Sequence, residues 1–170
     1  MSPDATAVHL AIGDFEHEAA STRRLLECLP DDRFDWRPHE KSWTLGELSS
    51  HLVHLLDWTR ATIETERFDM AEQTEPPAQF TDTASLLAAW DADFAKVQEA
   101  IKGLSAEDLG VTWTLAQGDQ TMMAMPRAAV LRGFCMSHIV HHRGQLTVYL
   151  RLLDVALPQV YGPTADDQSF

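Results

Sequence analysis

The sequence predicts an all-α fold, a four-helix bundle with one long crossover. Apolar residues recur every three or four positions in four long stretches, which is the spacing that gathers them on one face of a helix. Two of these stretches are separated by a longer segment, which would form the crossover of a bundle. At 170 residues the chain can bury a sizeable core, so we expect a single domain over residues 1–170.

The first helix is expected from Asp4 to about Cys28, and Pro30 ends it. The face expected to be buried consists of Val8, Ile12, Phe15, Ala19, Thr22, Leu26 and Leu29. The second helix is expected to begin after Ser42 or Thr44 and to run to about Phe68. The stripe of this second helix consists of Leu45, Leu48, Leu52, Leu55, Leu56 and Ile63. Glu47 lies three residues after Thr44, which is the spacing of a capping box.

A polar connector is expected over Met70–Gln79, followed by a third helix that begins at Thr81 or Asp82 and closes at Gly103. The fourth helix is expected over about Arg127–Asp154. Between the third and fourth helices, Val111–Met125 alternates weakly and has Gly118-Asp119 at its middle. A short β-hairpin is compatible with this pattern.

The charge of the chain limits its partners. The sequence contains 13 basic and 26 acidic residues, a net charge of -13. That charge repels phosphate backbones and anionic membranes, so we expect no nucleic-acid or membrane partner. It also disfavours a strongly anionic substrate, unless a local cation or metal inverts the potential. The two cysteines have no metal or redox spacing, and residues 1–4 lack the character of a signal peptide, so we expect a cytoplasmic protein.

The strongest functional signal is a pair of histidines, His138 and His142, within an otherwise apolar stretch. Imidazole binds transition metals at neutral pH, and residues at i and i+4 lie on one helix face. At about 100° per residue, His142 falls about 40° from His138 and inside the apolar stripe of the helix, whereas His141 falls about 60° to the other side. The first two histidines are therefore expected to face the core together. A pair of hydrogen-bonded core histidines is the competing interpretation.

The third ligand should come from another helix, and the second helix carries His51 and His54. His51 lies near the edge of the apolar arc, whereas His54 lies about 60° further toward the polar side. We therefore predict a metal site made of His51, His138 and His142, with His54 at the surface or behind the ligands. Three imidazoles leave a coordination position open, as in catalytic zinc sites, and Zn or Ni is the expected ion.

Other residues near these histidines have two open interpretations each. Glu47 and Asp57 are the carboxylates nearest to His51 in the sequence, and either could act as a base or orient an imidazole. Arg143 could bind an anionic group of a ligand, but a solvent-exposed helix arginine is the more common case. Gln145 could donate to a ligand or only pack. Catalytic residues beyond the metal ligands are not assigned by the sequence.

Two segments resemble the signatures of the DinB family (DinB/YfiT-like metalloenzymes). These are Ser42-Trp43-Thr44-Leu45-Gly46-Glu47-Leu48-Ser49-Ser50-His51 and His138-Ile139-Val140-His141-His142-Arg143-Gly144-Gln145-Leu146. The resemblance implies a four-helix bundle, a three-histidine divalent-metal site at His51, His138 and His142, and a homodimer. It also implies a relation to metal-dependent transferases that use low-molecular-weight thiols.

Three functional hypotheses follow. The first is a metal-dependent thiol S-transferase, in which a small thiol is the co-substrate and attacks a small electrophile. The second is a non-catalytic, stress-linked binding or scaffold bundle, in which a metal only ties the second helix to the fourth. The third, metal-assisted hydrolysis with Glu47 or Asp57 as base, ranks below both because neither carboxylate is clearly placed.

Overall fold

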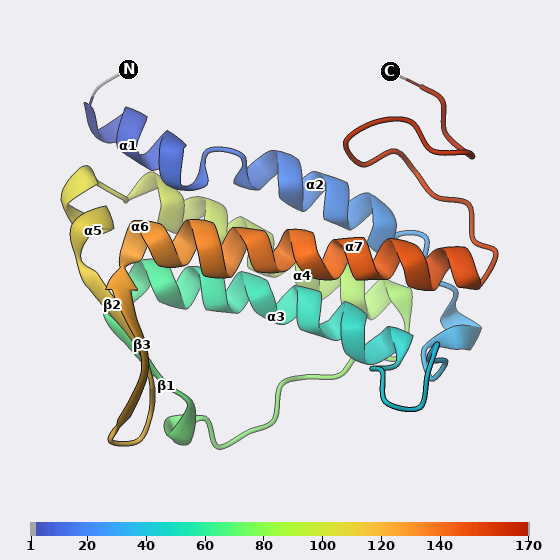
Figure 1. Cartoon of the computed structure of the whole chain (residues 1–170), viewed down its shortest axis with the longest axis horizontal. Helices are drawn as coiled ribbons and strands as arrows, with labels where there is room; N and C mark the ends of the chain where they lie inside the picture. Colours follow the sequence, from blue (N-terminus) through green and yellow to red (C-terminus); the bar gives the residue numbers. More distant parts are fainter. Residues whose placement is uncertain (1–2, 170) are drawn as a thin grey trace.

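The computed structural model describes residues 3–169 and is mostly helical, with one small sheet (Figure 1). The longer helices are α1 (Pro3–Ile12), α2 (Phe15–Leu26), α3 (Leu45–Glu64), α4 (Thr83–Lys102) and α7 (Ser137–Leu152). Shorter elements are η1 (Asp31–Arg33), η2 (Met70–Glu72), α5 (Ala106–Gly110), α6 (Arg127–Ala129) and a π-helical segment, η3 (Val130–Met136). The strands are β1 (Arg67–Asp69), β2 (Thr112–Gln117) and β3 (Gln120–Pro126). None of the helices in residues 3–169 is long and apolar enough to span a membrane.

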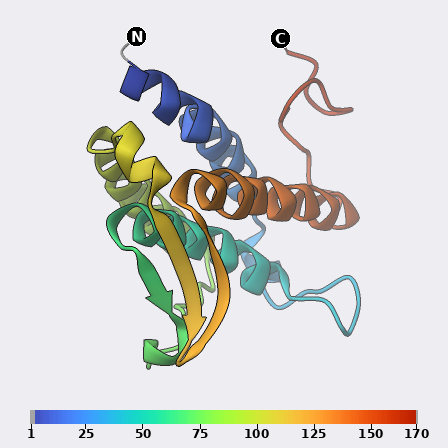
Figure 2. The ribbon, with the colours of Figure 1, turned by 60° about the vertical axis from the view of Figure 1, so that its left-hand side comes forward.

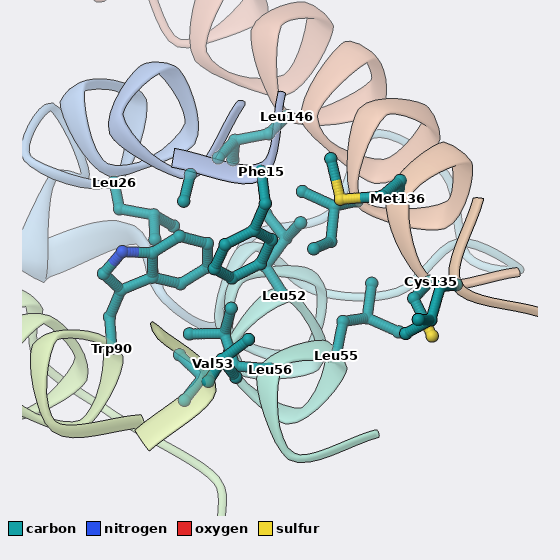
Figure 3. Packing of buried hydrophobic residues seen from close by; sticks show 14 of the residues in the cluster. Phe15, Leu26, Leu52, Val53, Leu55, Leu56, Trp90, Cys135, Met136 and Leu146 are labelled. Atoms are coloured by element: carbon teal, nitrogen blue, oxygen red, sulfur yellow. The ribbon is translucent and has the colours of Figure 1, made fainter. Parts of the chain in front are cut away.

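The core lies between α2, α3, α4 and α7. Helices α2 and α3 each pack against both α4 and α7. Figure 3 shows Phe15 of α2 and Trp90 of α4 directed into the same apolar interior as Leu52 of α3 and Leu146 of α7. The ring of Phe15 also stacks on Phe94 at 5.5 Å. Burial of these side chains is the main force that holds α3, which carries His51, and α7, which carries His138 and His142, in fixed positions.

The stretch expected to form one helix over Asp4–Cys28 is two helices, so this prediction was wrong. The chain turns at Gly13 and Asp14, where the Gly13 N–H donates to the carbonyl of His9 at 2.8 Å. A Cβ at position 13 would lie 2.5 Å from the same carbonyl oxygen, so glycine is required there. The turn directs α1 toward α5 and η3, which it contacts, while α2 follows the core.

Helices α3 and α4 begin where the sequence predicts. The Thr44 side chain accepts from the Glu47 N–H at 3.1 Å, and the Glu47 carboxylate accepts from the Thr44 N–H at 2.6 Å, which completes the capping box. Asp82 caps α4, which ends at Gly103. However, α3 ends at Glu64 and does not reach Phe68.

Residues 67–69 instead form β1, and the sheet corrects the all-α prediction. Its order is β1-β2-β3, with β1 parallel to β2 and β2 antiparallel to β3. Strand β2 and all but the last residue of β3 lie within the segment that alternates weakly, and Gly118 at their turn has a φ of 60°. The sheet is therefore not the isolated hairpin expected between the third and fourth helices, because β1 extends it. Asp69 joins the end of β1 to the turn between β2 and β3, because its carboxylate accepts from the backbone N–H of Gly118. The same carboxylate accepts from the N–H of Ala71 in η2.

The fourth expected helix begins at Arg127 and ends at Leu152 rather than Asp154, and it contains the π-helical turn η3 before the histidines. Figures 1 and 2 show the sheet near one end of the long helices and the loop between α2 and α3 near the other.

Candidate metal centre

Three histidines from two helices form one cluster. His51 comes from α3, and His138 and His142 come from successive turns of α7. One candidate ligand atom from each ring lies within 4.8 Å of those of the other two. The ring centroid of His142 is 4.6 Å from that of His51 and 4.7 Å from that of His138. The structure therefore brings together the three residues that helix phase selects.

The spacing of the nitrogens fits a transition-metal ion. The Nε2 atoms of His51 and His138 are 3.4 Å apart. Two imidazole nitrogens bound tetrahedrally to one zinc ion would be separated by about 3.3 Å, given Zn–N distances of about 2.0–2.1 Å. An N–H···N hydrogen bond at the observed distance would be long. The separation therefore suits two ligands of one ion at least as well as two hydrogen-bonded core histidines.

The three imidazoles are in the form that binds metals. Burial, with smaller contributions from the neighbouring histidines, lowers the pKa of both His51 and His138 to about 4. Burial also lowers the pKa of His142, although its hydrogen bond to Gln145 opposes that effect. All three rings are therefore neutral near pH 7, and each has a nitrogen lone pair available.

Gln145 fixes the orientation of one of these rings. Its Oε1 accepts a hydrogen bond from Nδ1 of His142 at 2.7 Å. The proton is therefore on Nδ1, and the lone pair is on Nε2. His138 differs, since its Nδ1 is buried without a hydrogen-bond partner in residues 3–169.

An aromatic side chain covers the cluster. Trp43 stacks on His142 with ring centroids 5.5 Å apart and an interplanar angle of 22°. Its ring also packs edge-on against that of His51, with ring centroids 4.9 Å apart. The hydroxyl of Tyr149 in α7 donates to the Trp43 carbonyl at 3.1 Å, which fastens the loop before α3 to the histidine helix.

A pocket of about 270 Å³ lies beside His142, which forms part of its wall. The other lining residues are Lys41, Ser42, Trp43, Leu48, Gln145 and Tyr149. One ring of the cluster therefore borders an open space that a small molecule could enter.

The two candidate carboxylates do not join the cluster. No carboxylate of residues 3–169 belongs to the group formed by the three histidines. The carboxylate of Glu47 is bound to the N-terminus of α3. Asp57 pairs with Arg60 at 3.4 Å and lines a separate cavity of about 530 Å³, which His54 also lines. His54 is half-buried beside this cavity, and its Nε2 has no hydrogen-bond partner in the described chain.

The two residues next to His142 on α7 also lie outside the cluster, one exposed and one buried. His141 is exposed, as its helix phase predicts. Arg143 is not an exposed helix arginine, and it contacts no pocket beside the histidines. Its side chain is only 2% exposed, and it forms an ion pair with Glu18 of α2 at 2.6 Å. Position 143 faces α2 rather than solvent, and the partner charge makes that burial tolerable.

Sequence reasoning missed Glu18 as the partner of Arg143. The one available signal was its position among the apolar residues of α2, three residues after Phe15 and next to Ala19. Glu18 also accepts from the hydroxyl of Tyr161, which belongs to the segment after α7. The buried ion pair of Glu18 and Arg143 helps to hold α7, and therefore His138 and His142, against α2.

Comparison with known proteins gives a consistent result. The sequence model of the DinB family matches residues 1–169. The chain is 27% identical over 161 residues to the uncharacterised protein YrdA of Bacillus subtilis (strain 168), a match that covers 90% of this chain and 87% of YrdA.

Solved structures show the same fold. A DinB-like protein from Bacillus cereus ATCC 10987 is similar with a TM-score of 0.70 and 21% identity, over 89% of this chain and 95% of that protein. The DinB-like protein YjoA of Bacillus subtilis has a TM-score of 0.65 and 20% identity, over 94% of this chain and 99% of its own. A DinB-family member from Exiguobacterium sibiricum 255-15 has a TM-score of 0.65 and 20% identity, over 87% of this chain and 92% of that protein.

Proposed function

This chain belongs to the DinB family, and we propose that it binds a divalent transition metal and transfers a small thiol to an electrophile. The observation that supports this most is the cluster of three neutral imidazoles with a pocket at its side. His51, His138 and His142 would hold the ion, and a three-nitrogen donor set suits Zn or Ni. We interpret α2, α3, α4 and α7 as a four-helix bundle whose facing helices supply the ligands.

The side chains around the cluster have distinct tasks in this proposal. A bound ion would supply positive charge that favours the thiolate form of a nearby thiol. Gln145 holds the proton of His142 on Nδ1, so the lone pair on Nε2 is available to the ion. Trp43 shields the imidazoles from water on one side, while the pocket admits the small molecules.

The transfer itself is a substitution at carbon. The thiolate sulfur forms a bond to the electrophilic carbon, and the leaving group departs with the electrons of its former bond. The thiol proton passes to solvent. No carboxylate is required in this step, in agreement with the positions of Glu47 and Asp57 outside the cluster.

A turnover assay with two neighbouring histidine variants tests the proposal. Metal-loaded wild type is incubated with monochlorobimane and each of several low-molecular-weight thiols, and the fluorescent thioether is measured. We expect turnover with at least one thiol, its loss in His142→Ala, and its retention in His141→Ala, which removes an exposed neighbour. Failure of every thiol with metal-loaded wild type, or equal turnover in His142→Ala, would overturn the proposal.

A purely structural metal is the second candidate, because the cluster joins α3 to α7. Chelation separates the two roles. A structural ion contributes its binding energy to folding, so its removal should lower the melting temperature by many degrees. An ion with a catalytic role should leave most of the stability in place, since the core between these helices is apolar and extensive.

A further inference from the structure

We propose that the pocket beside the cluster selects a substrate with a carboxylate group, and that the ammonium of Lys41 binds this carboxylate. This inference rests on the proposed function, because it names the class of molecule that the same site accepts. It concerns a residue that belongs to neither the cluster nor the two family signatures.

The lining of the pocket combines polar and positively charged residues with aromatic ones. Lys41, Ser42 and Gln145 contribute an ammonium, a hydroxyl and an amide, while Trp43 and Tyr149 contribute apolar surface. No carboxylate belongs to the lining. An anionic group of a ligand would therefore meet hydrogen-bond donors and one cation without a competing negative charge.

Lys41 is a free cation in a strongly acidic chain. The other two lysines are neutralised, Lys96 by Asp93 at 2.7 Å and Lys102 by Glu99 at 2.7 Å. Lys41 forms no ion pair with any residue in 3–169, although Glu40 precedes it. In a protein with a net charge of -13, an unpaired lysine in the lining of the pocket supplies a local positive charge.

The backbone that carries Lys41 has one local contact and one contact with α7 nearby. Its N–H donates to Nδ1 of His39 at 3.1 Å. Two residues later, the Trp43 carbonyl accepts from Tyr149, whose ring also contacts the edge of Trp36 at 5.8 Å. The loop backbone is thus fastened next to the pocket, and the side chain of Lys41 tethers the ammonium within its own length of that backbone.

The size and charge of the pocket favour a small monoanion. A volume of about 270 Å³ is below the range of about 300–1,000 Å³ that holds drug-sized ligands. One ammonium matches the charge of a carboxylate but only half of the charge of a phosphate dianion, and Lys41 is the one lysine or arginine of the lining. A bound carboxylate leaves the rest of the molecule to contact Trp43 and His142.

Three thiols that differ in charge provide the test. The Co(II)-loaded full chain is titrated with 3-mercaptopropionate, 2-mercaptoethanol and cysteamine, and thiolate binding is followed by its charge-transfer absorption. We expect the anion to bind most tightly and the cation most weakly. Lys41→Gln should weaken 3-mercaptopropionate by about twofold to fivefold, the range for a solvent-exposed charge pair, and should leave 2-mercaptoethanol unchanged.

Two further variants sharpen the result. Lys41→Arg should keep the preference for the anion, and Lys102→Gln should not change it, since Lys102 is exposed and paired elsewhere. Equal effects of Lys41→Gln on all three thiols, or none on 3-mercaptopropionate, would overturn the inference while the proposed function stands. Failure of the cluster to bind Co(II), or of every thiol to bind the loaded protein, would overturn both.

Discussion

Nδ1 of His142 donates a hydrogen bond to Oε1 of Gln145, one helical turn away, at 2.7 Å. A glutamine carbonyl can only accept, so the contact fixes the tautomer of the ring and leaves Nε2 free for an ion. Both residues line the pocket, and His142 also belongs to the cluster, so the same contact orients a candidate ligand and shapes the pocket wall.

Removal of the glutamine acceptor should weaken metal binding. We predict that Gln145→Ala lowers the affinity for Zn by about tenfold to a hundredfold, the range for loss of a residue that orients a ligand. Gln145→Glu keeps an acceptor and should retain most of the affinity. Competition with a chromophoric chelator measures both values. Equal affinity in wild type and Gln145→Ala would show that the contact does not orient His142 for an ion.

The buried ion pair between Glu18 and Arg143 should matter for stability. We predict that Glu18→Gln lowers the free energy of unfolding by about 3 kcal/mol, because it leaves a buried guanidinium without a counter-charge. Glu99→Gln, which removes an exposed partner of Lys102, should cost at most about 1 kcal/mol. Urea unfolding of the two variants gives the comparison, and similar losses in both would contradict the role assigned to burial.

The carboxylate of Asp69 should make stability depend on acid pH. Hydrogen bonds from the backbone N–H groups of Gly118 and Ala71, with Arg67 nearby, hold the pKa of Asp69 below its usual value. A group with a depressed pKa stabilises the fold above its unfolded pKa, and the contribution is lost as the pH falls through its folded pKa. The stability difference between wild type and Asp69→Asn should therefore be largest near pH 6 and should shrink toward pH 3. Urea unfolding at several pH values checks this; a difference that does not change with pH would contradict it.

Two glycines should respond to alanine in opposite directions. A Cβ at Gly13 would lie 2.5 Å from the His9 carbonyl oxygen, so Gly13→Ala should destabilise the turn between α1 and α2. Gly144 lies inside α7 with no atom within 4 Å of the added Cβ, so Gly144→Ala should stabilise by about 0.5–1 kcal/mol. Thermal unfolding of the two variants reports the signs. A loss of stability in Gly144→Ala would show that this position has a constraint beyond helix propensity.

The parts of the site that lie on regular helices were predictable. His51, His138 and His142 lie on apolar arcs, so helix phase alone placed their side chains on the faces that meet. The start of α3 was equally clear, because the capping box is a local signal between Thr44 and Glu47. In each case the residues that determine the structure are neighbours in the sequence.

The remaining features depend on contacts between distant residues. Strand β1 has three residues, too few for a periodic signal, and it exists because it pairs with β2 more than forty positions later. Arg143 seemed exposed because its partner Glu18 is on another helix. The position of Lys41 beside His142 depends on the loop that Tyr149 fastens, which no sequence pattern predicts.

Metal content is the most direct test of the central claim, that His51, His138 and His142 bind an ion. Untagged protein, purified without chelators or nickel resin and then reloaded with Zn, is analysed by mass spectrometry for metal per chain. We predict about one ion per chain in wild type and in His54→Ala, and almost none in His51→Ala, which removes the ligand from α3. Wild type without stoichiometric metal, or equal metal in His51→Ala and wild type, would contradict the account.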